Sequence, residues 1–170
     1  MGGVNGAEAL KALYALQEKD LEIDRLRAEA ESLPEELVAL QGQVETLEER
    51  LTNLLERRAE LEREYNRHSL DIEDLSAKEK QAEEEQKRAQ SAREQTQYEN
   101  RIQQIKDRIR ELLELSTPIM EAMENLEAEI AQVEEELAAL RPRLQELLEA
   151  NRARVAELEA AIAAKVEERT

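Results

Sequence analysis

The chain has 170 residues, of which 38% are charged and 2% aromatic, with no Phe, Trp or Cys and a formal net charge of −17 at pH 7. A globular core of this length would normally contain several large aromatic side chains, which the three tyrosines cannot supply. The absence of cysteine excludes disulfides, thiolate nucleophiles and Cys-based zinc sites, and a single histidine excludes a multi-histidine metal site.

Residues 1–7 are expected to form a flexible leader. They have neither a basic start nor an apolar stretch, so they do not form a signal peptide. Elsewhere, uncharged runs stay far below the ~18 apolar residues that a membrane span needs. We therefore expect a cytoplasmic protein that does not bind membranes.

Apolar residues then recur in alternating steps of four and three. The first run contains Leu26, Ala30, Leu33, Leu37, Leu40, Val44, Leu47, Leu51, Leu54, Arg58, Leu61, Tyr65, His68, Ile72, Leu75, Glu79, Ala82, Gln86 and Ala89. The second run contains Tyr98, Ile102, Ile105, Ile109, Leu112, Ser116, Ile119, Met123, Leu126, Ile130, Val133, Leu137, Leu140, Leu144 and Leu147. A 3.5-residue repeat sustained over about nine heptads predicts helices that supercoil around a partner.

The partner is expected to be the other half of the same chain, because the two runs have similar lengths and flank a stretch, residues 76–97, with few large apolar groups. The prediction is an all-α fold, a long antiparallel two-helix coiled-coil hairpin over residues 8–170. Arm one covers about 8–90, the tip about 91–97 and arm two about 98–170. The alternative is one continuous helix in a parallel dimer, about 250 Å long.

Three prolines, Pro34, Pro118 and Pro142, interrupt the arms. The apolar phase continues through all three, so kinks are expected near them rather than chain reversals. At Asn151 the apolar spacing becomes two steps of four, a stutter that should locally relax the supercoil. A tip near 91–96 would bring this stutter close to Pro34.

The two apolar runs form the seam, the line along which the two helices are expected to meet. Three positions at or beside this seam carry unusual side chains. Arg58 should lie near Glu127 and Glu129, where it either reaches a surface carboxylate or locks the register. His68 is interpreted as a satisfied or partly exposed seam residue. Tyr65, with Met120 and Met123, is interpreted as core packing and not as a cofactor site.

Runs of glutamate such as 83–85 and 134–136 are interpreted as solvated helix faces, because acid–base catalysis needs a concave site that separates two pKa values. A Gly-rich phosphate loop, a Ser/His/Asp set and metal-ligand spacing are all missing from the sequence. The prediction is that the chain is not an enzyme, with no catalytic, cofactor-binding or metal-binding residues.

Basic residues gather around the expected tip. Residues 86–110 contain seven basic residues and only three acidic ones, Glu94, Glu99 and Asp107. This is a local excess of four positive charges in an acidic chain. The candidate partner-binding residues are Lys87, Arg88, Arg93, Arg101, Lys106, Arg108 and Arg110. They are either ordinary solvated surface or a contact point for an acidic protein or a single nucleic-acid strand. RNA is disfavoured by the net charge and by the scarcity of aromatic residues for base stacking.

Five segments resemble a bacterial family. LKAL (10–13), LQEKDLEIDRL (16–26) and SLPEE (32–36) are similar to its first helix, and YENRI (98–102) and MEAMENLE (120–127) to its second. Members have a long N-terminal coiled-coil hairpin followed by a C-terminal zinc ribbon with four cysteines. The resemblance covers about residues 10–165 and departs from the family around 93–97, where Asn-Pro-like tip residues are missing.

The ribbon itself is absent, so the resemblance implies a chain cut before it, with zinc only where such a ribbon exists. It also implies a non-catalytic adaptor or chaperone, because relatives are linked to an alternative RNA polymerase sigma factor, flagellar regulation and RNA binding. It transfers no functional residue to this chain. We expect a protein partner, with transcription components as candidates, and a monomer or weak dimer. The rival functions are a structural spacer arm of a larger chromosome-maintenance-type protein and a nucleic-acid-binding hairpin that uses the basic tip.

Overall fold

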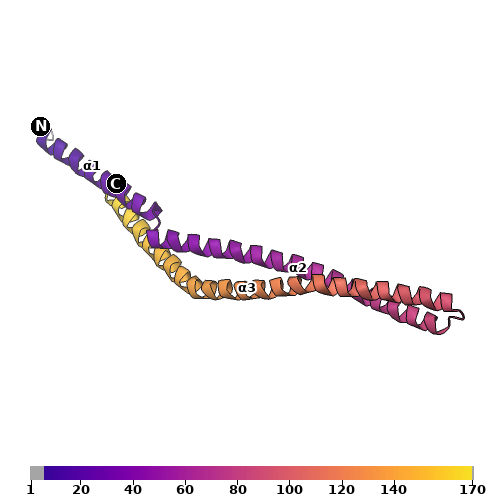
Figure 1. Ribbon diagram of the computed structural model, residues 1–170. Coiled ribbons are helices and arrows are strands. Elements are labelled where there is room, and N and C mark those ends of the chain that lie inside the picture. Colours follow the sequence, from indigo (N-terminus) through magenta and orange to yellow (C-terminus); the bar gives the residue numbers. More distant parts are fainter. Residues whose placement is uncertain (1–5, 170) are drawn as a thin grey trace. The chain divides into compact units, whose positions relative to one another are not determined.

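A computed structural model describes residues 6–169, which form three helices joined by two short connections (Figure 1). Helix α1 spans Gly6–Glu31, α2 spans Glu35–Lys87 and α3 spans Ala92–Arg169. No strand occurs in this range. The all-α class and the helical hairpin are confirmed, and the alternative of one continuous helix is wrong, because the chain leaves the helix between Lys87 and Ala92.

The turn between α2 and α3 comprises residues 88–91, which corrects the predicted tip at 91–97. Ser91 and Glu94 explain the difference, because together they form an N-terminal capping arrangement. The backbone N–H of Glu94 donates to Ser91 Oγ at 3.1 Å, and Glu94 Oε2 accepts from the backbone N–H of Gln90 at 3.2 Å. The polar residues 95–97, expected in the turn, therefore lie in the first turns of α3.

The connection between α1 and α2 corrects two further predictions. At Pro34 the helix is interrupted over residues 32–34 rather than kinked, because proline disfavours the helical conformation at the residue before it. Pro118 and Pro142, in contrast, lie within the uninterrupted α3. The predicted leader is wrong at Gly6 and Ala7, which belong to α1, where Ala and Glu are good helix formers. Residues 1–5 of that leader lie outside the described part.

Contacts divide the chain into two compact units. The first unit combines the described residues of 1–46 and 137–170, and its buried side chains are Ile23, Leu37, Leu40, Val44 and Leu137. The second unit is Leu47–Glu136, with the hairpin turn and the buried residues Leu47, Leu61, Ala82, Ile102, Leu112, Ser116, Ile119, Ile130 and Val133. Ser116 satisfies its hydroxyl within α3 by donating to the Leu112 carbonyl at 2.8 Å.

The two predicted apolar runs match the observed burial. Every position from Leu26 to Ala89 and from Tyr98 to Leu147 in those runs is buried or half-buried, except Leu33. Leu33 is 54% exposed because it lies in the non-helical connection, where the helical period no longer sets its direction. The spacing of apolar residues therefore identified which face of each helix is covered.

Candidate partner-binding site

The seven basic residues proposed for the tip lie from the end of α2 to the first part of α3. Four of them contact carboxylates: Lys87 with Glu84 at 3.3 Å, Lys106 with Glu79 at 3.9 Å, Arg108 with Glu111 at 3.0 Å and Arg110 with Asp107 at 3.9 Å. Arg88, Arg93 and Arg101 are exposed. Because Glu79, Glu84 and Glu111 lie just outside the range 86–110, they reduce the positive charge that this surface presents.

Arg58 of α2 contacts Glu127 of α3, as the register predicted. Its Nη2 lies 3.0 Å from Glu127 Oε1, and the two side chains are 41% and 51% exposed. The guanidinium thus extends from a seam position toward solvent, as long basic side chains do. Such exposed pairs contribute up to about 1 kcal/mol, so this contact marks the alignment of α2 with α3 more than it stabilises the fold.

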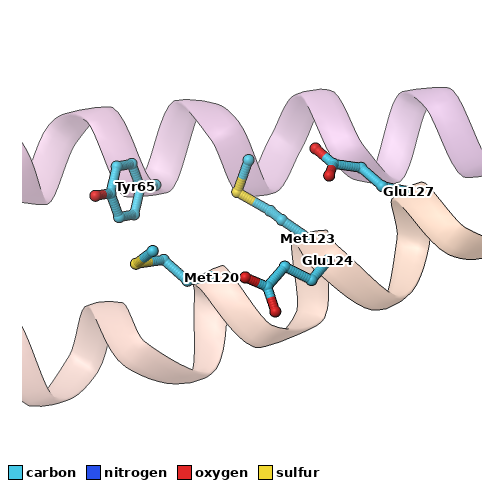
Figure 2. A pocket seen from close by; sticks show the side chains of 5 residues that line it. All are labelled: Tyr65, Met120, Met123, Glu124 and Glu127. Carbon is cyan, nitrogen blue, oxygen red and sulfur yellow. The ribbon is translucent and has the colours of Figure 1, made fainter.

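A hollow of about 270 Å³ opens beside this ion pair and is lined by Tyr65, Met120, Met123, Glu124 and Glu127. Figure 2 shows the Tyr65 ring on α2 and the two thioethers on α3, with the carboxylate of Glu124 beside them. Tyr65 and Met123 are half-buried, as expected for the core, whereas Met120 is 47% exposed. The interpretation of all three residues as core packing is therefore wrong for Met120, which follows a seam residue and faces outward.

The α3 segment that contributes most of this hollow is strongly acidic. Residues 111–136 contain nine glutamates and no lysine or arginine. Among them lie three exposed large apolar side chains, Leu113 (53%), Leu115 (49%) and Met120. Sequence reasoning treated the glutamate runs as solvated faces only and missed this surface. This surface could have been recognised in the sequence, because a long stretch without lysine or arginine also contains apolar residues just outside the seam.

His68 lies half-buried between the helices of the second unit, and its Nδ1 atom is buried without a hydrogen-bond partner among the described residues. The ring is therefore partly exposed, as expected, but not satisfied at that nitrogen. Across residues 6–169, no three His, Cys, Asp or Glu side chains gather in a way that could hold a metal ion. None of the described helices has a stretch long and apolar enough to cross a membrane.

In the first unit, Arg154 of α3 connects the stutter to the break between α1 and α2. Its guanidinium donates to the carbonyls of Glu29 at 2.9 Å and Ser32 at 2.7 Å, and to Asn151 Oδ1 at 2.9 Å. Glu29 lies in the last turn of α1, where helix carbonyls lack intrahelical partners, and its carbonyl also accepts from Ser32 Oγ at 3.0 Å. Ser32 directly follows that helix. The prediction that Pro34 and Asn151 lie at the same level is supported, and Arg154 is a residue that the sequence reading missed.

Ion pairs also join the arms of the first unit, namely Arg143 with Glu36 at 2.8 Å, Lys165 with Glu22 at 3.2 Å and Arg169 with Asp20 at 3.0 Å. The hydrogen bond to Glu36 raises the pKa of Arg143, and the hydrogen bond to Glu22 raises the pKa of Lys165. Both groups therefore stay cationic at neutral pH. Any stabilisation that the ion pair of Lys165 contributes is therefore present at neutral pH. It is lost only when alkaline pH removes the proton of Lys165.

Comparison with known proteins adds information on the fold. No protein-family model matches the chain. No curated protein matches it either. A solved structure from Mycobacterium smegmatis is similar in fold, with a TM-score of 0.77 and 24% sequence identity over 94% of this chain and 67% of that one. At this identity the similarity concerns the fold alone, and it supports the helical hairpin.

Proposed function

We propose that the hairpin is an antiparallel coiled coil and that the chain is a non-catalytic protein-interaction module of the bacterial cytoplasm. The burial of side chains at alternating three- and four-residue steps on both arms supports the coiled coil. The contacts of Arg58 with Glu127 and of Lys106 with Glu79 support one continuous antiparallel register in the second unit. The resemblance to the zinc-ribbon family supports an adaptor or chaperone role, with a transcription component as a candidate partner.

The observation that carries the interaction function is the acidic, partly apolar surface of residues 111–136. Its hollow at Tyr65, Met120 and Met123 provides an apolar floor, and Glu124 and Glu127 provide carboxylates at its edge. Methionine side chains adapt to differently shaped apolar partners, so they are common at such binding surfaces. Because one helix can lie in a groove along two others, the fitting partner is an amphipathic helix with lysine and arginine on its flanks.

The basic tip is the site of the rival nucleic-acid function. Arg88, Arg93 and Arg101 are exposed and favour a contact with phosphates, but four of the seven candidate bases already contact carboxylates. Counterion release would make RNA binding strongly dependent on salt. Titration of single-stranded RNA at low and moderate salt therefore separates the two functions. A steep loss of binding with salt would support the tip, and no binding at low salt would remove it.

The coiled-coil register is tested by cross-linking. With cysteines engineered at Leu61 and Met123, seam positions of α2 and α3, we expect a disulfide within one chain under mild oxidation, because the aligned seams bring these positions into one layer. Mass spectrometry of the non-reduced protein identifies the product. A matched pair at Leu61 and Leu147 should stay reduced. Cross-links found only between chains would contradict the hairpin register.

The binding surface is tested with a labelled synthetic amphipathic peptide rich in Lys and Arg. We expect Met120→Lys to weaken its binding at least about tenfold, because the new ammonium removes apolar floor and repels the basic flanks. Fluorescence anisotropy with the folded full chain gives the affinity. Leu70→Lys is the matched control, since Leu70 is 64% exposed on α2 and outside the hollow. Equal affinities for both variants, or no binding by the unmodified chain, would contradict the proposed site.

A further inference from the structure

Helix α1 continues well past the last contacts that it makes with α3. Within the first unit, the ion pairs nearest to this end are Lys165 with Glu22 and Arg169 with Asp20. Every residue from Gly6 to Glu18 is exposed. Figure 1 shows α1 extending beyond the end of α3. This part of α1 is therefore a helix of several turns whose side chains are all exposed.

Two separate apolar lines run along the exposed part. Leu16 is in helical phase with Ile23, which is buried at 3% exposure on the side that faces α3, whereas Leu13 lies about 80° away from Ile23 around the helix. Leu10, Tyr14 and Leu21 follow a different line, spaced by four and seven residues, and are 68%, 64% and 63% exposed. At 100° per residue this second line lies on the face of α1 opposite to Ile23.

The separation of the two lines limits what can cover the second one. A helix that prolonged the direction of α3 would cover the line of Leu16 and Ile23. It would leave Leu10, Tyr14 and Leu21 in solvent, because they point the other way. This face carries two shallow hollows that could accept side chains of a partner. One lies among Leu10, Tyr14 and Glu18, and the other lies among Tyr14, Gln17 and Leu21. Its occupant must approach from the side opposite to α3.

The charges along this face identify the occupant. The whole chain carries −17, so two copies repel each other along most of their length. Residues 6–19 are an exception, because Glu8 and Glu18 balance Lys11 and Lys19. The next two acidic side chains, Asp20 and Glu22, form ion pairs with Arg169 and Lys165 of the same copy. Lys11 and Glu18 lie one heptad apart on the same flank of the apolar line. A second copy that runs in the opposite direction would place each of these two charges beside its opposite.

We propose that two copies of this chain associate through an antiparallel pairing of their α1 helices along this face. Leu10 of one copy then packs against Leu21 of the other, and Tyr14 packs against Gln17. Lys11 of each copy faces Glu18 of the other, because residues on the same flank meet in an antiparallel helix pair. The contact is two-fold symmetric, so each favourable pair occurs twice.

The dimer is expected to be weak. The paired segment of about 16 residues is only ~24 Å long. Such a contact falls short of the ~1,000 Å² of total buried surface that marks a stable specific complex. Monomer and dimer should therefore exchange, with the dimer fraction rising with protein concentration. This inference is independent of the groove at Met120, which lies in the other unit.

Sedimentation velocity of the full chain over a concentration series tests the pairing. We expect Lys11→Glu and Glu18→Lys each to lower the association constant about tenfold or more, because each turns two attractive pairs into two repulsive ones. Lys11→Glu changes the net charge to −19 and Glu18→Lys changes it to −15, from −17. A general charge effect would strengthen association in the second variant, whereas the proposed pairing weakens it.

The decisive experiment mixes the two single variants. One chain then carries glutamate at positions 11 and 18 and the other carries lysine at both, so a mixed dimer restores all four charges as opposite pairs. Association in the mixture but in neither variant alone is the expected result. Leu70→Glu, on the exposed face of α2, should associate like the unmodified chain. An unmodified chain that stays monomeric, single variants that associate normally, or a mixture that stays monomeric would each overturn the proposal.

Discussion

Replacing Leu137 by aspartate is expected to unfold much of the first unit. Leu137 is fully buried, at 0% exposure, in α3. The change removes a buried leucine and leaves an unpaired carboxylate in an apolar seam, with an expected cost of about 4–5 kcal/mol. That cost is a large fraction of the 5–15 kcal/mol that typically stabilises a domain. Far-UV circular dichroism should show a thermal midpoint lowered by roughly 8–20 °C.

The same change at Leu47 tests the second unit. Leu47 is 9% exposed and lies on the first arm, so Leu47→Asp should also lower the midpoint strongly. Leu70→Asp is the matched control, because Leu70 has the same side chain in the same helix but is 64% exposed. Its melt should be close to that of the unmodified chain. Unchanged melts for both seam variants would show that the covered face has been assigned wrongly.

Replacing Arg154 by alanine is expected to loosen the end of α1. The guanidinium donates to the carbonyls of Glu29 and Ser32, and hydrogen bonds from charged donors contribute about 1.5–3 kcal/mol. Partial exposure of Arg154 places the expected loss at about 1–3 kcal/mol. Amide hydrogen exchange in the last turn of α1 should then become roughly five- to hundredfold faster, since local opening controls exchange there.

Arg152→Ala provides the matched control for this experiment. Arg152 is exposed, carries the same charge and lies two residues away on α3, so its removal changes the net charge equally. Exchange at the end of α1 should remain as in the unmodified chain. Equal acceleration in both variants would mean that charge, and not the cap on the α1 carbonyls, governs that turn.

The residues that stabilise the fold differ from those proposed to bind partners. Leu137 and Leu47 hold the arms together, whereas Met120 and the α1 face at Tyr14 are exposed and contribute little to the fold. Substitutions at the exposed positions should therefore change association without changing the melt. This separation lets a loss of peptide binding or of self-association be interpreted without the complication of unfolding.

The helical class and the covered faces could be predicted from residue spacing, whereas the break at residues 32–34 was expected to be only a kink. Apolar side chains at alternating steps of three and four define one stripe on a helix, and that geometry depends only on the local backbone. The pairing of Arg58 with Glu127 followed from the same spacing, once the centre of the hairpin was placed near the apolar-poor stretch. The turn was placed a few residues late because the cap at Ser91 and Glu94 was not recognised.

The local sequence by itself determined the helices, their buried stripes and the acidic stretch at residues 111–136. Only the tertiary structure decided which exposed groups stand together, because that depends on side chains brought from distant positions. Tyr65 and Met120 meet across the helices, and Arg154 reaches carbonyls more than a hundred residues earlier. Local propensity contains no information on such contacts. They follow from the register of one arm against the other, which is set by the summed packing of many weak apolar layers.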